Sequence, residues 1–190
     1  MPFELQPDLL DRCLRGERQA FRQLVEGSQR YAFRLAFRMV WDEDEAKEIV
    51  QEAFIRVWKH LPAFDRTTRF TTWLYRIVVN LSHDTLRRRA RSRDRMVPLD
   101  DARTMVADGE ESTLINRDLA ARVRALAEDL PPAQRTVFVL RDLQDLSIEE
   151  TAEVLSMSPG AVKANLCYAR RRIRERMELT EHPENEHHDV

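Results

Sequence analysis

The sequence predicts an all-α protein in which two small helical domains, a bundle and a helix-turn-helix unit, are joined by a flexible acidic linker. Apolar residues recur three and four positions apart along most of the chain, which is the spacing of a buried helix face. Only 4 glycines and few β-branched runs are present, so strands are disfavoured. The pattern lapses over residues 94–113, which are acidic and contain Pro98 and Gly109. We therefore predict domains over residues 1–93 and 114–179, with a linker at 94–113 and a disordered tail at 180–190.

The charge distribution keeps a polyanion among the candidate partners. A formal net charge of -2 would disfavour nucleic-acid binding if the charges were spread evenly. Instead the arginines gather in two blocks, one over residues 87–95 and the other over residues 170–176. Because local potential steers a charged ligand, either block can attract a polyanion.

Several other classes of protein are disfavoured. The N-terminus lacks a basic region followed by an apolar run, and no segment approaches about 18 consecutive apolar residues. We therefore expect a cytoplasmic protein with no direct membrane insertion. Cys13 and Cys167 are far apart and lack the spacing of a zinc site. A Gly-rich phosphate loop, a metal-ligand spacing and a nucleophile-base pair are all missing from the sequence, so we expect no enzyme, no metal and no cofactor.

The first domain begins with a short helix from Asp8 to Leu14 and a longer one from Glu17 to Val40. The longer helix carries apolar residues on two sides, which is typical of the central helix of a bundle. These residues are Phe21, Leu24, Val25, Tyr31, Leu35 and Met39 on one side, and Phe33, Phe37 and Val40 on the other.

The next helix starts at the carboxylates of residues 42–44, where the helix dipole favours them, and Pro62 ends it. Its predicted buried face comprises Ala46, Ile49, Val50, Ala53, Phe54, Val57, Trp58 and Leu61. Ile55 lies off this face, and its neighbours on the helix surface are Glu48, Gln51, Glu52, Arg56 and Lys59. Such a mixed face suits a protein partner, although a single exposed isoleucine is also common.

The helix from Phe70 to Arg93 has two different faces. One is a buried stripe of Trp73, Leu74, Ile77, Val78 and Leu81. The other carries Arg76, Asn80, Asp84, Arg87 and Arg91, a set equipped to grip a polyanion or simply to be solvated. In the preceding segment, residues 62–70, aromatic and basic side chains alternate, as they do where unstacked bases lie on aromatic rings.

The second domain contains a helix from Leu114 to Leu130 and another that begins at Pro131-Pro132 and reaches Leu143. Ser147 and Glu150 then form a capping box, and Ser158 caps a further helix with Pro159 in its first position. Two short helices joined by a tight turn predict a helix-turn-helix, although helical hairpins without a DNA partner are capped in the same way.

The second helix of this pair has a predicted buried side and a predicted DNA side. The buried residues are Val162, Leu166, Ala169 and Ile173. The opposite side holds Ala164, Cys167, Tyr168 and Arg171, with Lys163 and Arg174 at the flanks. These six residues are candidates for base and phosphate contacts in a major groove. One unit for duplex and another for unstacked strand would suit a protein that opens DNA at a defined site.

Three segments, in order, resemble the extracytoplasmic-function sigma factors of bacterial RNA polymerase. They are DEAKEIVQEAFIRVWKHL at residues 44–61, FTTWLYRIVVNLSHDTLRR at 70–88 and LSIEETAEVLSMSPGAVKANLCYARRRIRE at 146–175. The resemblance implies a transcription initiation subunit with region 2 and region 4 domains. It implies core RNA polymerase and promoter DNA as partners, and an anti-sigma factor as a regulator.

The resemblance also assigns roles to residues. The implied −10 contacts are Phe64, Arg66, Arg69, Phe70, Trp73, Arg76, Asn80, Asp84 and Arg87. The implied −35 contacts are Lys163, Ala164, Cys167, Tyr168 and Arg171, and the implied polymerase contacts are Glu48, Gln51, Glu52, Ile55 and Arg56. Family members frequently carry threonine at position 161, Ser-Arg at 164–165 and a basic residue at 168, where this chain has Ala161, Ala164-Asn165 and Tyr168.

Two rival interpretations differ in what they require. A self-sufficient helix-turn-helix regulator would share the second domain, but it would not need the aromatic-basic segment or the arginine face of the helix from Phe70 to Arg93. Such a regulator would bind its promoter without polymerase. Cys167 invites a redox-switch hypothesis, and its alternative is a small side chain that faces the groove.

Overall fold

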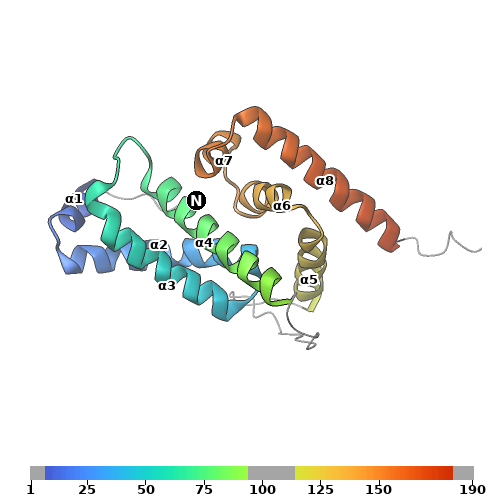
Figure 1. The fold of residues 1–190 in the computed structure, drawn as a ribbon, viewed down its shortest axis with the longest axis horizontal. Helices are drawn as coiled ribbons and strands as arrows, with labels where there is room; N and C mark the ends of the chain where they lie inside the picture. Colours follow the sequence, from blue (N-terminus) through green and yellow to red (C-terminus); the bar gives the residue numbers. More distant parts are fainter. Residues whose placement is uncertain (1–6, 94–113, 182–190) are drawn as a thin grey trace, which may run out of the picture. The chain divides into compact units, whose positions relative to one another are not determined.

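The computed structural model describes residues 7–93 and 114–181, which form helices and no strand (Figure 1). These residues fall largely into two compact units. The first unit contains α1 (Pro7–Leu14), α2 (Arg18–Val40), α3 (Glu43–His60), the 3-10 turn η1 (Leu61–Ala63) and α4 (Phe70–Arg93). The second contains α5 (Leu114–Glu128), α6 (Pro132–Phe138), the π-helical turn η2 (Val139–Leu143), α7 (Ile148–Leu155) and α8 (Pro159–Glu181). The all-α prediction is confirmed, whereas the predicted linker and most of the predicted tail lie outside the described residues.

The core of the first unit lies between α2, α3 and α4, which pack on one another, while α1 packs on α2. Its fully buried side chains come from the predicted stripes of these helices and include Leu24, Leu35, Met39, Val57, Leu74 and Val78. One expectation was wrong: Trp58, assigned to the buried face of α3, is 43% exposed. Its indole packs edge-on against Phe21 with the ring centroids 4.7 Å apart, so only part of the indole ring is buried.

The turn between α2 and α3 is tight. Trp41 adopts the left-handed conformation with φ 55°, and its N–H donates to the carbonyl of Phe37. Asp42 then caps α3, because its Oδ1 accepts a hydrogen bond of 2.9 Å from the N–H of Glu45. This geometry brings the last carbonyls of α2 close to the acidic first turn of α3.

The second unit contains the predicted helix-turn-helix. Ser147 Oγ accepts from the N–H of Glu150 at 3.0 Å, and Glu150 Oε2 accepts from the N–H of Ser147 at 2.8 Å, so the capping box that precedes α7 is confirmed. Ser158 Oγ accepts from the N–H of Ala161 at 3.2 Å and caps α8. Between the two helices Ser156 is left-handed, with φ 53°, and the N–H of Met157 donates to the carbonyl of Ala152. These bonds fix the turn between α7 and α8.

The sequence pattern missed the change of helix type before this motif. The predicted α-helix to Leu143 ends at Phe138, and η2 follows with a bond from the N–H of Gln144 to the carbonyl of Val139 at 3.0 Å. Val139 and Leu140 are both fully buried. Because the N–H of Gln144 bonds five residues back instead of four, this turn is wider than an α-helical turn.

None of the helices within residues 7–93 and 114–181 is both long and apolar enough to cross a membrane.

Candidate nucleic-acid interface

An aromatic cluster stands where α4 begins. The ring of Phe64 lies with its centroid 4.8 Å from Trp73 and 6.3 Å from Phe70, and the last two are 6.1 Å apart. Phe70 is only 4% exposed, while Phe64 and Trp73 are half-buried. All three aromatic residues were predicted to contact DNA. Phe70 lies on the buried side of the cluster, whereas Phe64 and Trp73 retain exposed surface on which a nucleobase can stack.

The segment between η1 and α4 is held by its own side chains. Asp65 Oδ1 accepts from the N–H of Thr67 at 2.9 Å, and Asp65 Oδ2 accepts from the hydroxyl of Thr67 at 2.7 Å. The hydroxyl bond, and after it the backbone bond, lowers the pKa of Asp65 below its ordinary value. Arg66 pairs with Asp11 of α1, and Arg69 is exposed. The predicted base-capturing segment is therefore ordered by polar contacts in the free chain.

The predicted polar face of α4 is present. Asn80, Asp84, Arg87 and Arg91 are all exposed, and Arg76 precedes Asn80 by one turn. Asp84 forms an ion pair with Arg87. The neighbouring Arg89, by contrast, points toward the unit and donates to Glu45 and to the carbonyl of Val40. The basic block thus contains arginines with different partners, which the sequence alone did not distinguish.

The structure brings the predicted −35 residues together on one face of α8. Lys163, Ala164, Cys167, Tyr168 and Arg171 are all exposed, while Val162, Leu166 and Ala169 on the opposite side are buried. The guanidinium of Arg171 lies 5.2 Å from the centroid of the Tyr168 ring, a cation-π contact. Arg171 also lies 3.7 Å from a carboxylate oxygen of Glu175.

Arg170, next to this face, serves a different purpose. Its Nε and Nη2 bind the two carboxylate oxygens of Asp142 at 2.9 and 2.5 Å. This bidentate bond raises the pKa of Arg170 above its ordinary value. Because Asp142 belongs to η2, the pair fixes the rotation of α8 relative to the helix that precedes the motif.

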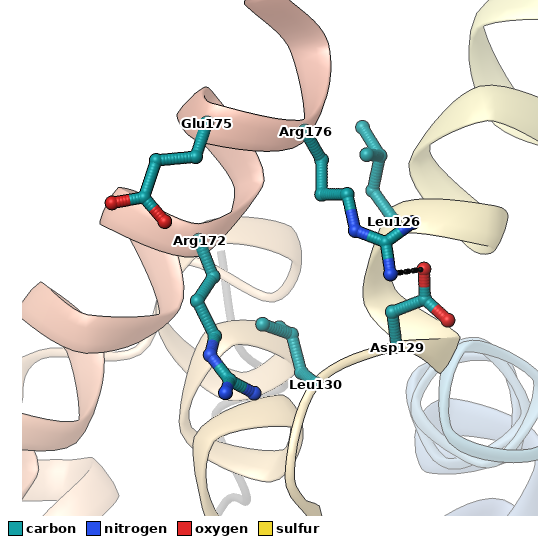
Figure 2. A pocket seen from close by; sticks show the side chains of 6 residues that line it. All are labelled: Leu126, Asp129, Leu130, Arg172, Glu175 and Arg176. Atoms are coloured by element: carbon teal, nitrogen blue, oxygen red, sulfur yellow. Dashed lines mark ion pairs between the residues drawn. The ribbon is translucent and has the colours of Figure 1, made fainter. Parts of the chain in front are cut away.

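A cleft of about 240 Å³ lies between α5 and α8 (Figure 2). Leu126 and Leu130 give it an apolar side, and Arg176 closes one edge through a bond of 3.0 Å to Asp129. Figure 2 shows Arg172 directed toward the Leu130 side, while the carboxylate of Glu175 points away from the pair. The cleft uses helix positions other than those of the predicted base-reading face.

A second exposed surface lies on α3. Ile55 is 40% exposed and Trp58 43% exposed, one helical turn apart. Arg56 and Glu52 form an ion pair of 2.9 Å beside them, and Glu48 and Gln51 are also exposed. Sequence reasoning missed Trp58 as a surface residue because this residue lies at the edge of the buried stripe of α3. Its spacing of three residues from Ile55 was the available signal.

Groups of three or more His, Cys, Asp or Glu that could hold a metal ion are absent from the part of the chain that the structure describes. Cys13 is buried and Cys167 is exposed. Burial raises the pKa of the Cys13 thiol, so this cysteine is suited to packing rather than to reaction.

Two helical units, one with an aromatic-basic loop beside an arginine face and one with a helix-turn-helix, define the class of protein as a sigma factor. Residues 24–92 match Sigma-70 region 2, and residues 120–173 match Sigma-70, region 4. The ECF RNA polymerase sigma factor SigW of Bacillus subtilis is 33% identical over 171 residues, which cover 86% of this chain and 91% of SigW. The chain belongs to the ECF sigma factors, which act in transcription initiation and are not enzymes.

Solved structures share the arrangement. CnrH, in complex with the cytosolic domain of CnrY, has a TM-score of 0.68 and 26% identity, with 90% of this chain and 96% of CnrH covered. The sigma factor RpoE, in complex with the anti-sigma factor NepR from Bartonella quintana, also has a TM-score of 0.68, at 20% identity over 85% of this chain and 98% of RpoE. The second likeness concerns the fold alone.

The bonds of Asp65 generate a prediction about pH. The folded-state pKa lies below that of the unfolded chain, so the ionised carboxylate stabilises the turn at neutral pH. This contribution is lost as the pH falls through the lowered pKa. Carbon-detected NMR titration of the Asp65 carboxyl should show a higher pKa in Thr67→Val than in the wild type, because the hydroxyl donor is gone. Thr67→Ser, which keeps the hydroxyl, should retain the lowered pKa. Identical titrations of the wild type and Thr67→Val would contradict this account.

Proposed function

We propose that the two units divide promoter recognition between them, and that α3 of the first unit binds core RNA polymerase. The observation that carries this proposal is the aromatic cluster of Phe64, Phe70 and Trp73 beside the exposed polar face of α4. On this proposal residues 1–93 and 114–179 are the functional domains, residues 94–113 connect them, and the protein works in the cytoplasm. Residues 180–190, the predicted tail, have no assigned role.

The first unit would capture the −10 element as single strand. Phe64 and Trp73 offer half-buried rings to an unstacked base, and Arg66 and Arg69 supply positive charge nearby. Arg76, Asn80, Asp84 and Arg87 would contact the DNA at the upstream edge of the melted region. Phe70 supports the two outer rings from below, since its own ring is buried.

The second unit would read the −35 element with α8. Arg171 and Tyr168 would present a guanidinium and an aromatic ring to the groove, and Lys163 would lie at the edge of the same helix face. Ala164 and Cys167 are small enough to allow close approach of the helix. The chain lacks the basic residue often found at position 168 in the family, and Tyr168 instead supports Arg171.

Core polymerase would bind the α3 surface that consists of Glu48, Gln51, Glu52, Ile55, Arg56 and Trp58. Two adjacent apolar side chains with a charged rim form the pattern of a protein interface. An anti-sigma factor would be a further partner of this chain, and the complex of the similar protein CnrH with the cytosolic domain of CnrY supports binding of a second protein. Such a regulator would cover the polymerase-binding surface.

The self-sufficient regulator is less well supported, because such a protein has no use for an aromatic cluster suited to unstacked bases. On the sigma-factor proposal, strong sequence-specific binding requires core polymerase to hold both units on the promoter at once.

Ile55→Glu and Trp58→Ala should each weaken association with core polymerase by about tenfold or more, the cost of losing a central interface side chain. Titration of labelled core polymerase measures the affinity, and circular dichroism checks that helicity is unchanged. Met177→Glu is a matched control, since Met177 is 42% exposed but lies on α8. Wild-type affinity for both α3 variants would place the polymerase contact elsewhere.

Replacing Phe64 or Trp73 by alanine should impair open-complex formation on a duplex promoter, since stacking of a base on an aromatic side chain contributes about 1–3 kcal/mol. The stacking free energy is needed to melt the duplex. A template that is already mismatched across the −10 element should therefore restore much of the activity. Permanganate footprinting measures the opening, and Gln29→Ala, at an exposed position of α2, serves as a control. Equal defects on duplex and mismatched templates would mean that the loop has another role.

Arg171→Ala should relax the preference for a base in the −35 element, at a cost of about 1–3 kcal/mol for the cognate sequence. Lys163→Ala, if Lys163 holds a phosphate, should instead lower affinity for all sequences and reduce the salt slope by about 1. Selection of randomised promoters by holoenzyme tests both variants, with Met177→Ala as the control on the same helix. An unchanged consensus for Arg171→Ala would exclude base reading by this residue.

A further inference from the structure

Arg89 stands inside the basic block of α4 but does not face solvent with its neighbours. Its Nε donates to Glu45 Oε1 at 2.7 Å, and its Nη1 donates to the carbonyl of Val40 at 2.9 Å. Its Nη2 lies 3.6 Å from Asp42 Oδ2. The guanidinium therefore joins α4 to the end of α2 and to the start of α3.

The partners of Arg89 are groups that need a cation. Val40 ends α2, so its carbonyl lies at the negative end of that helix dipole, while Asp42 and Glu45 place two carboxylates in the same turn. The second oxygen of Glu45, Oε2, is buried and has no hydrogen-bond partner within the described residues. Arg89 thus supplies the positive charge for a junction that otherwise concentrates negative charge.

Apolar packing of α4 ends before Arg89. Leu81 and Thr85 are buried, but from Leu86 to position 92 every side chain of α4 is half-buried or exposed. The last two turns of the helix are therefore held less by core packing than by the contacts of Arg89. Arg87 and Arg91 lie on these two turns.

Helix geometry couples Arg89 to the exposed face. Residues two positions before and after Arg89 are each rotated by about 160° from it, so Arg87 and Arg91 share the side opposite to Arg89. If Arg89 is fixed against α2 and α3, these two guanidinium groups must point outward. The rotation and position of the end of α4 thereby determine where its cations meet a phosphate backbone.

We infer that Arg89 is a positioning residue, which with Glu45 and the Val40 carbonyl orients the C-terminal turns of α4 for promoter DNA and does not itself contact the DNA. The inference rests on the proposed role of the α4 face in DNA binding.

The experiment uses holoenzyme and a promoter duplex that the wild-type holoenzyme has selected from a randomised library. Glu45→Ala should lower promoter affinity by about fivefold, within the range seen for residues coupled in one network. This direction is opposite to the direct effect of charge, because removal of a carboxylate weakens repulsion of phosphate. Glu45→Gln removes the same charge but keeps an oxygen that accepts from Arg89, so it should retain most of the affinity.

Salt dependence separates Arg89 from true phosphate contacts. Arg87→Ala should reduce the slope of log affinity against log salt by about 0.9, the value for one lost phosphate contact. Arg89→Ala should lower affinity and leave the slope close to that of the wild type. The double variant Arg89→Ala with Glu45→Ala should lose no more than the stronger single variant, since both changes disrupt the same contact.

Controls distinguish the inference from its alternatives. Asp44→Ala removes an exposed carboxylate next to Glu45 and should not lower affinity. Thermal unfolding of each variant identifies a general loss of structure, and Arg89→Gln, which removes the charge but keeps an amide donor, replaces Arg89→Ala if the alanine variant unfolds. Equal affinities of Glu45→Ala and Glu45→Gln, or a reduced salt slope in Arg89→Ala, would overturn the inference. Wild-type affinity in Arg87→Ala and Arg91→Ala would instead refute the proposed DNA-binding face.

Discussion

The burial of one apolar face along a long helix is the constraint on which both units depend. In α4 the stripe through Leu74, Val78 and Leu81 packs against α2 and α3, and in α8 the stripe through Val162, Leu166 and Ala169 is buried in the second unit. A helix fixed on one side must present the residues about 180° away to solvent. The side chains proposed to meet DNA therefore gain their direction from apolar residues that never touch it.

Arginine-rich segments on such helices contain two kinds of residue with separate tasks. Arg89 and Arg170 bind carboxylates of neighbouring elements, Glu45 and Asp142, through short bonds. Such charge-assisted bonds fix a helix rotation because the guanidinium is planar and directional. The exposed arginines beside them then keep a defined orientation. A count of basic residues overestimates the number available to DNA, because part of the block is used within the fold.

The apolar periodicity of the sequence was enough to predict the helices and most of the core, since burial dominates where a stripe is continuous. The capping residues Ser147 and Ser158 were equally predictable, because their side chains bond within three residues. Three features depended on distant contacts and were not predictable. Trp58 lies at the edge of its stripe against Phe21, η2 carries Asp142 to Arg170 of α8, and Arg89 reaches a turn 44 residues earlier in the sequence. The candidate face of α8 was predictable because its residues are adjacent on one helix.

Several exposed arginines that are proposed to contact DNA form ion pairs in the free chain. Arg66 pairs with Asp11, Arg87 with Asp84, and Arg171 with Glu175. An exposed pair of this kind contributes at most about 1 kcal/mol, so a phosphate or a base can displace the carboxylate at low cost. As long as the ion pair is intact, the carboxylate lowers the local positive potential. It thereby weakens the largely electrostatic attraction of the protein for any DNA. This cost is the same for any DNA, but unspecific binding has only electrostatic attraction to offset it, whereas at a promoter base contacts and polymerase add further free energy. A net charge of -2 is therefore compatible with a protein that binds DNA, because binding at a promoter does not depend on electrostatic attraction alone.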